Sequence, residues 1–192
     1  MFFKQFGGKV RPELLSQYQQ SENWQNGSFQ NLEPTSMGGN LGDLPRIIYK
    51  QLTQRTGREP NQPLPVQPFS KADFMGAATN ARFIWYGHSA ILMRMEGKNI
   101  LIDPMLGPDT TPIAPMSTKR FSENTLSLID DFPEIDLLLL THDHYDHLDY
   151  ASIQKLRHKT KRYFTALGVK RHLVSWGCLL YTSDAADEAK WG

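Results

Sequence analysis

A run of four leucines, Leu137–Leu140, leads directly into a segment that follows the pattern H-x-H-x-D-H. Side chains two residues apart project to the same side of an extended or turning backbone, so His142 and His144 can bind one cation together. Asp146 and His147 come after the turn and face a second cation nearby. Imidazole and carboxylate suit zinc and related divalent metals. A buried strand ending in such a cluster is typical of the functional edge of an α/β fold, and we favour this interpretation over a polar loop that merely contains histidines.

Length and charge narrow the class of protein. The chain has 192 residues, which is enough for one domain with its own core, and 40% of them are hydrophobic, as in globular domains. The formal net charge is +1, so we expect no nucleic-acid partner. No window approaches the length of a membrane span, and the first residues lack the apolar core of a signal peptide. We therefore expect a cytoplasmic protein without a transmembrane segment.

The C-terminal segment resembles no natural domain ending. Its eleven residues Cys178–Glu188 match the translation of an adaptor used in transposase-based sequencing libraries. We expect residues 178–192 to be adaptor-derived and the native sequence to stop near Gly177; a genuine tail of small residues is the alternative. The sequence has one cysteine, Cys178, and it lies in this segment. Neither a disulfide nor a cysteine-based zinc finger is therefore expected in the native part.

Residues 1–80 are rich in Gln, Asn, Gly and Pro and show little periodicity. Short helices are expected over 12–18 and 41–55, the second with Asp43 as its cap, and the prolines of 60–68 favour an extended arm. This composition predicts a wrapping extension without a core of its own. A disordered leader is the alternative.

The pattern changes at Arg82, where apolar and β-branched runs begin. Strands are expected over 83–86, 90–95 and 100–102, and a hairpin turn at 96–99 joins the last two. Further along, strands and helices alternate: part of a helix in 122–130, a strand at 135–140, a helix capped by Asp149, a strand at 162–165 and a helix over 168–176. A long Gly/Pro/Thr loop, typical of functional loops, follows Asp103 through Pro115. Such alternation predicts the α/β class.

Four other polar residues are candidates for the site. Asp103 ends a predicted strand, where it either orients a metal-binding histidine through the free ring nitrogen or serves as a structural cap. His88 lies between two predicted strands and either lines the pocket or is a turn residue. His158 and His172 fall on predicted helices among Lys and Arg, so we expect both at the solvated surface.

Three segments together resemble the metallo-β-lactamase superfamily: Trp85–Ala90, Ile100–Gly107 and Leu140–Asp149. Within it, they are similar to the branch of N-acylphosphatidylethanolamine-hydrolysing phospholipase D and its bacterial relatives. The resemblance is sharpest over 82–177. It implies an αββα sandwich with a dinuclear zinc site at one edge, of which residues 81–177 are the N-terminal, incomplete half.

The resemblance also implies a role for each residue of the motif. His142 and His144 would bind the first Zn²⁺ ion, and Asp146 and His147 the second. In the family, one further histidine for each ion and a bridging aspartate come from later motifs, which we expect only in a longer parent protein. Asp146 is also the expected catalytic residue, because its carboxylate can orient a metal-bound hydroxide.

We therefore expect the full-length parent to be a zinc-dependent hydrolase. A phosphodiesterase resembling phospholipase D is favoured, acting on a small-molecule or phospholipid substrate, and a phospholipid implies peripheral contact with a membrane. A lactonase or sugar-phosphate hydrolase of the same superfamily is the first alternative, and a non-catalytic scaffold or binding module is the second. The 192-residue chain itself is expected to be inactive and poorly stable, because half of the ligands and half of the sheet are expected elsewhere.

Overall fold

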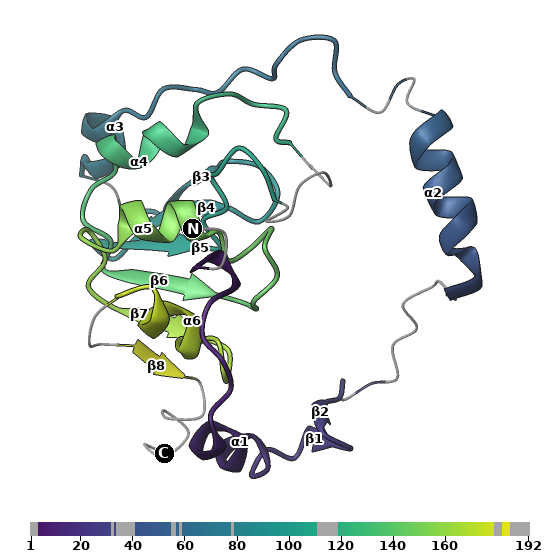
Figure 1. The fold of residues 1–192 in the computed structure, drawn as a ribbon. Coiled ribbons are helices and arrows are strands. Elements are labelled where there is room, and N and C mark those ends of the chain that lie inside the picture. The colour runs from purple at the N-terminus through teal and green to yellow at the C-terminus, as the bar shows by residue number, and fades with distance from the viewer. Residues whose placement is uncertain are drawn as a thin grey trace.

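A mixed six-stranded sheet organises the chain in the computed structural model (Figure 1). The structure describes residues 4–31, 33, 41–54, 57, 59–77, 79–110, 119–178 and 182–184. The strands are β3 (Arg82–Trp85), β4 (Ile91–Met95), β5 (Lys98–Ile102), β6 (Leu137–Leu140), β7 (Tyr163–Thr165) and β8 (Thr182–Asp184), and this is also their order in the sheet. The first three pair antiparallel and the others parallel. The predicted α/β class is confirmed.

Two tight turns shape the antiparallel part of the sheet. Glu96 and Gly97 both have positive φ, at 49° and 75°, which suits the two-residue turn of the β4–β5 hairpin expected from the sequence. Between β3 and β4, Gly87 and His88 also have positive φ, at 89° and 47°. The second turn matters for function, because it carries the His88 imidazole.

Helices cover one face of the sheet. The strand register aligns one row on that face, in which Ile84 is partly buried and Leu92, Leu101, Leu138 and Tyr163 are buried. The covering helices are α3 (Lys71–Met75), η3 (Thr125–Ser127), α4 (Leu128–Asp131), α5 (Tyr150–Leu156) and α6 (Lys170–Ser175). Phe74, Ile129, Ile153 and Leu173 from these helices join the same core cluster. Burial of this apolar surface is the main stabilising contribution.

The opposite face of the sheet is apolar but uncovered by the described residues. The register places Phe83, Met93, Ile100 and Leu137 in one row and Trp85, Ile91, Ile102, Leu139 and Phe164 in the next. All of these side chains are partly or fully exposed, and Phe83 and Trp85 reach 71% and 65%. One layer of helices on one sheet is half of an αββα arrangement, as the sequence predicts.

The N-terminal segment contributes small elements that precede the sheet in the chain. They are η1 (Lys4–Phe6), α1 (Pro12–Tyr18), β1 (Trp24–Gln25), β2 (Ser28–Phe29), η2 (Leu41–Asp43) and α2 (Leu44–Thr53), and α2 stands apart from the sheet in Figure 1. The Trp176 indole donates to the Lys4 carbonyl at 2.6 Å, and the Leu64 amide donates to Phe121 O at 2.7 Å. These contacts suit a wrapping extension, whose boundary near residue 80 stays a prediction.

Several sequence expectations differ in detail from the structure. Asp43 stands at the N-cap of α2 but makes no side-chain capping bond, because its backbone is helical there; its carboxylate lies 3.5 Å from Arg46. The strand expected from residue 135 begins at Leu137, since Ile135 forms an isolated bridge to Thr160. Asp149 caps α5 as expected.

Two stretches fall partly outside the described residues. Residues 111–118 of the predicted functional loop lie there. Of the segment expected to be adaptor-derived, the structure describes Cys178, which is buried, and β8, which pairs with β7. The origin of that segment stays a prediction that the nucleotide sequence tests. Among the described helices, none is long and apolar enough to cross a membrane.

Candidate metal centre

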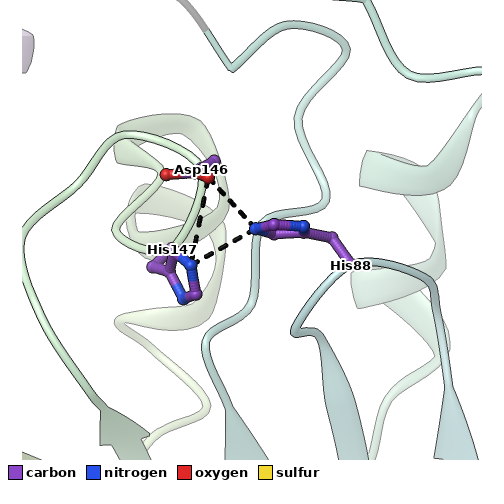
Figure 2. Close-up of side chains that lie close together, drawn as sticks. All are labelled: His88, Asp146 and His147. Atoms are coloured by element: carbon purple, nitrogen blue, oxygen red, sulfur yellow. Dashed lines mark hydrogen bonds and ion pairs between the residues drawn. The ribbon is translucent and has the colours of Figure 1, made fainter. Parts of the chain in front are cut away.

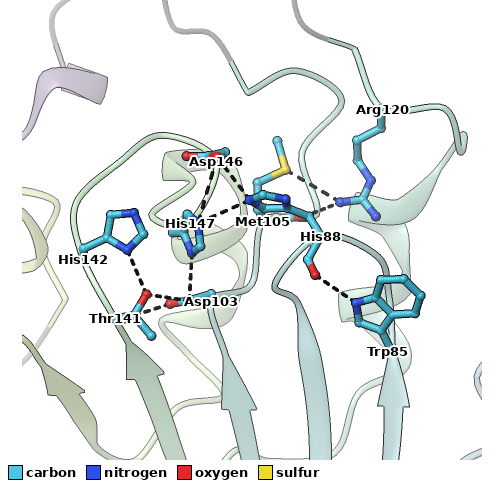
Figure 3. A network of polar contacts seen from close by, with 9 residues as sticks. All are labelled: Trp85, His88, Asp103, Met105, Arg120, Thr141, His142, Asp146 and His147. Carbon is cyan, nitrogen blue, oxygen red and sulfur yellow. Dashed lines mark hydrogen bonds and ion pairs between the residues drawn. The ribbon is translucent and has the colours of Figure 1, made fainter. Parts of the chain in front are cut away.

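Three loops meet at one edge of the sheet (Figure 3). Strands β5 and β6 are parallel, and β3 runs in the same direction because β4 is antiparallel to both of its neighbours. The carboxyl ends of β3, β5 and β6 therefore share an edge, as ligand sites in α/β sheets do. This edge gathers His88 after β3, Asp103 after β5, and the histidine-rich segment after β6.

Two groups of potential ligands form at this edge, and they share one carboxylate. The first comprises His142, His144 and Asp146, and the second His88, Asp146 and His147. In each group, the ligand atoms all lie within 4.8 Å of one another. All four residues of the sequence motif are therefore brought together, and their imidazole and carboxylate donors fit divalent zinc-like cations.

Asp103, at the end of β5, contacts the segment that follows β6. Its side chain is 2% exposed, and it accepts hydrogen bonds from the Thr141 amide at 2.9 Å and the Thr141 hydroxyl at 2.7 Å. His147 Nδ1 lies 2.8 Å from Asp103 Oδ2. An ionised carboxylate only accepts, so we infer that Nδ1 donates to Asp103 and that the edge of the ring with Nε2 faces the centre. This carboxylate–histidine contact is the arrangement that orients metal-binding histidines.

The same logic extends to His142 through Thr141. The Thr141 hydroxyl donates its single proton to Asp103, so it accepts from His142 Nδ1, 2.9 Å away. His142 Nε2 is then the acceptor nitrogen that is left to bind a cation. Burial, and next the neighbouring His147 and His144, lower the pKa of His142. A lowered pKa favours the neutral imidazole, which is the form that binds metals.

His88 faces the motif from the other side (Figure 2). Its Nε2 lies 3.1 Å from Asp146 Oδ2 and 3.2 Å from His147 Nε2. The sequence left a pocket residue and a turn residue as alternatives for His88. In the structure it is part of the turn, and its ring points at the ligand groups. The Trp85 indole donates to the His88 carbonyl at 2.9 Å, which holds the turn from the side of β3.

Arg120 ties two of the three loops together, and sequence reasoning missed it. Its guanidinium, about half buried, donates to the carbonyls of Tyr86 and Met105. Tyr86 precedes the turn that carries His88, and Met105 follows Asp103 by two residues. One planar group thus fixes the spacing of two loops. No local sequence pattern around Arg120 predicts these contacts.

The burial of His172 differs from the prediction made from the sequence. His172 was expected at the solvated surface, but it is 9% exposed, and its Nε2 lies 3.4 Å from Asp143 Oδ2. Arg171 Nη2 donates to the same oxygen at 3.0 Å. The bond from His172 and the charge of Arg171 hold the pKa of Asp143 well below its usual value. Asp143 therefore anchors the motif to α6, whereas His158 is exposed, as expected.

A cavity of about 560 Å³ opens beside the first group of ligands. It is lined by Gln5, Phe6, Thr110, Asp143, His144, Tyr145, Asp146, Leu148, Arg171, His172 and Trp176. Phe6 of the N-terminal segment meets Tyr145 of the motif edge to face, with ring centroids 6.3 Å apart. The N-terminal segment thus forms part of the wall of a space that borders two of the candidate ligands.

Residues 98–192 match a family model described as a beta-lactamase superfamily domain. Over this stretch the chain is similar to that superfamily, which is also the one that its sequence motifs resemble. The matched stretch includes β5, β6 and the H-x-H-x-D-H segment.

Relatives with curated descriptions extend the similarity toward the N-terminus. An uncharacterized protein of Mycobacterium tuberculosis, Rv0906, is 31% identical over 161 residues, 83% of this chain and 42% of that protein. The N-acyl-phosphatidylethanolamine-hydrolyzing phospholipase D 1 of Caenorhabditis elegans is 27% identical, over 80% and 46%. A UPF0173 metal-dependent hydrolase of Saccharolobus solfataricus is 34% identical, over 49% and 36%. The chain spans less than half the length of each of these relatives.

Proposed function

We propose that this chain is part of a zinc-dependent phosphodiesterase whose substrates are phospholipid-like esters. The observation that carries the proposal is the pair of ligand groups joined by Asp146. Two three-residue groups that share a carboxylate are what a two-metal hydrolytic centre requires. The name of the Caenorhabditis elegans relative supports a phosphodiester substrate, and that of the Saccharolobus relative supports metal dependence.

Each residue has a defined task in this proposal. His142 and His144 would hold one cation, and Asp146 with His147 the other. Divalent cations bound there supply Lewis acidity and make a water molecule more acidic, so that it can attack near neutral pH. Asp146 is the catalytic residue, because its carboxylate can accept a hydrogen bond from the attacking water and aim it. Asp103 keeps His147 in the orientation and tautomer that this requires.

The neighbouring cavity suits one part of an amphiphilic substrate. Phe6, Tyr145 and Trp176 give its wall apolar surface, and His144 and Asp146 form the edge toward the ligands. An acyl or glycerol portion can lie against the aromatic rings while the ester approaches the metal centre. A substrate of this kind reaches the protein at a membrane surface, so peripheral membrane contact is part of the proposal.

Turnover with defined esters tests the proposal. Because the 192-residue chain itself is expected to be inactive, the zinc-loaded full-length parent protein would be assayed with N-acyl-phosphatidylethanolamine in mixed micelles, with a lactone and with a sugar phosphate. We expect release of phosphatidic acid and loss of that activity in Asp146→Asn, while His158→Ala, an exposed histidine on no ligand group, stays active. Hydrolysis of the lactone alone, or of the sugar phosphate alone, would instead indicate a lactonase or a sugar-phosphate hydrolase. Zinc binding without any turnover would favour a binding module.

A further inference from the structure

We propose that His88 is a third protein ligand of the metal position formed by Asp146 and His147. This inference rests on the proposed metal centre and adds to it a residue outside the H-x-H-x-D-H motif. His88 comes from the turn between β3 and β4, and 59 positions separate it from His147 in the sequence. Figure 2 shows the two imidazoles and the Asp146 carboxylate converging on one point.

The spacing of the three ligand atoms fits a tetrahedral cation site. The distances are 3.1 Å from His88 Nε2 to Asp146 Oδ2, 3.2 Å between the two Nε2 atoms, and 3.9 Å from His147 Nε2 to Asp146 Oδ2. Ligand atoms bonded to one tetrahedral zinc ion at about 2.0–2.1 Å lie about 3.3–3.4 Å apart. The three measured separations bracket this value. A cation can therefore reach all three atoms with little movement of the chain.

The contact with Asp103 gives a second geometric argument. His147 Nδ1 lies 2.8 Å from Asp103 Oδ2, so the opposite edge of the ring, with Nε2, faces His88 and Asp146. Imidazole nitrogen and carboxylate oxygen are the atoms with which proteins bind zinc, and three of them face one another here from two different loops.

The turn holds His88 in place for this role. His88 has φ of 47°, a left-handed conformation that costs free energy for a residue with a side chain. The turn is closed by bonds from the Tyr86 amide to Ala90 O at 2.8 Å and from the Ala90 amide to Gly87 O at 3.1 Å. These bonds fix the backbone that carries the imidazole, so little ordering is needed when a cation binds.

Exposure leaves room for further ligands beside His88. The side chains of His88 and Asp146 are 50% and 39% exposed, so one side of the position faces solvent. The histidine and the bridging aspartate that the resemblance implies in later motifs can approach from this side. A zinc ion can expand from four to five ligands, so His88 adds to that set and does not exclude it.

Metal titration of the 192-residue chain tests the assignment. Zn²⁺ and Co²⁺ would be titrated into the wild type, His88→Asn and His158→Ala, with a chromophoric chelator as competitor. Asparagine tolerates positive φ, so His88→Asn should keep the turn, which circular dichroism checks. We expect at least tenfold weaker binding at one position and a weaker visible cobalt band in His88→Asn, with His158→Ala unchanged. Unchanged affinity and spectrum in folded His88→Asn would overturn the assignment.

A measurement on the wild type covers the case in which the variant does not fold. Imidazole ¹⁵N spectra, with the His88 ring assigned, would be recorded before and after addition of Zn²⁺. A shift of His88 Nε2 to the metal-bound range is the expected result, and an unshifted Nε2 beside shifted His147 and His142 signals refutes the proposal. Absence of ester turnover in the full-length parent, together with zinc binding that depends on His88, would refute only the proposed function.

Discussion

Asp103 Oδ2 lies 2.8 Å from His147 Nδ1, and this contact links the end of β5 to the metal-binding segment after β6. Asp103 also holds Thr141 by two bonds, so a single buried carboxylate sets the geometry of the strand end and of two histidines. The orientation of the centre therefore depends on a residue that does not reach the ligand position itself.

Replacing Asp103 with asparagine should weaken zinc binding about 10–100-fold, because His147 loses the acceptor that fixes its tautomer. The buried side chain also loses charge-assisted bonds, so we expect a stability loss of about 1–3 kcal/mol. Chelator competition and thermal unfolding measure the two effects. Asp131→Asn, which removes an exposed carboxylate on α4, is the matched control. Equal zinc affinity in Asp103→Asn and the control would contradict the role.

The substitution Arg120→Lys should weaken zinc binding, although Arg120 is not itself a candidate ligand. A lysine ammonium cannot span the two carbonyls that the planar guanidinium bonds, so the turn with His88 and the loop after Asp103 lose their common tie. We expect a stability loss of about 1–3 kcal/mol and weaker zinc binding. Thermal melts and zinc titration measure these, with Arg46→Lys on the exposed face of α2 as the control. No change in either quantity relative to the control would show that the tie is dispensable.

Acid should remove the contribution of Asp136 to stability. The Asn99 amide, 3.0 Å from Asp136 Oδ2, and next the Lys161 ammonium lower the pKa of Asp136. A lowered pKa means that the folded state binds this proton less readily than the unfolded state, so the stabilisation is present above the ordinary pKa and is lost as pH falls through the folded value.

The test compares wild type and Asp136→Asn by urea unfolding between pH 7 and pH 2.5. The variant should be less stable at pH 7, and the difference should shrink toward the lowest pH. Glu134→Gln removes the more exposed carboxylate beside the same lysine and should change stability little. A difference that stays constant across the range would rule out the Asp136 carboxylate as its source.

The uncovered sheet face should make the 192-residue chain prone to bind apolar dyes and to self-associate. Phe83→Thr with Trp85→Thr removes its two most exposed aromatic rings while keeping β propensity. Dye fluorescence and the fraction of higher species in sedimentation should both fall. Tyr49→Thr removes an equally exposed ring on α2 and should leave both unchanged. Equal effects of the two replacements would argue against a specific apolar face.

The sequence predicted the parts of the centre that are local in the chain. His142, His144, Asp146 and His147 lie within six residues, so spacing alone brought them together, and Asp103 stood out because it ends an apolar strand. The convergence of His88 with His147 depends on the antiparallel hairpin and its turn, which no short pattern encodes. The contacts of Arg120 are likewise long-range and reach carbonyls, which carry no sequence signal.

The exposure of His172 could not be predicted from its position on a helix. Basic neighbours indicated a solvated face, yet the N-terminal segment lies over this part of α6. A side-chain carbon on Gly7 would come within 1.7 Å of His172 Nδ1, so only glycine permits the approach. The burial of His172 thus depends on a segment far away in the chain, whose path the composition of α6 cannot predict.

The shared Asp146 has a consequence for how the protein acquires its ions. Asp146 lies within reach of both ligand groups, so a cation bound by one group is close to the position of the other, and two cations at that spacing repel each other. Loading should therefore proceed in two unequal steps, through a singly loaded species with its own affinity and spectrum. If the proposed function holds for the parent protein, the singly loaded species would prevail where the metal is scarce, and turnover would follow the supply of the metal.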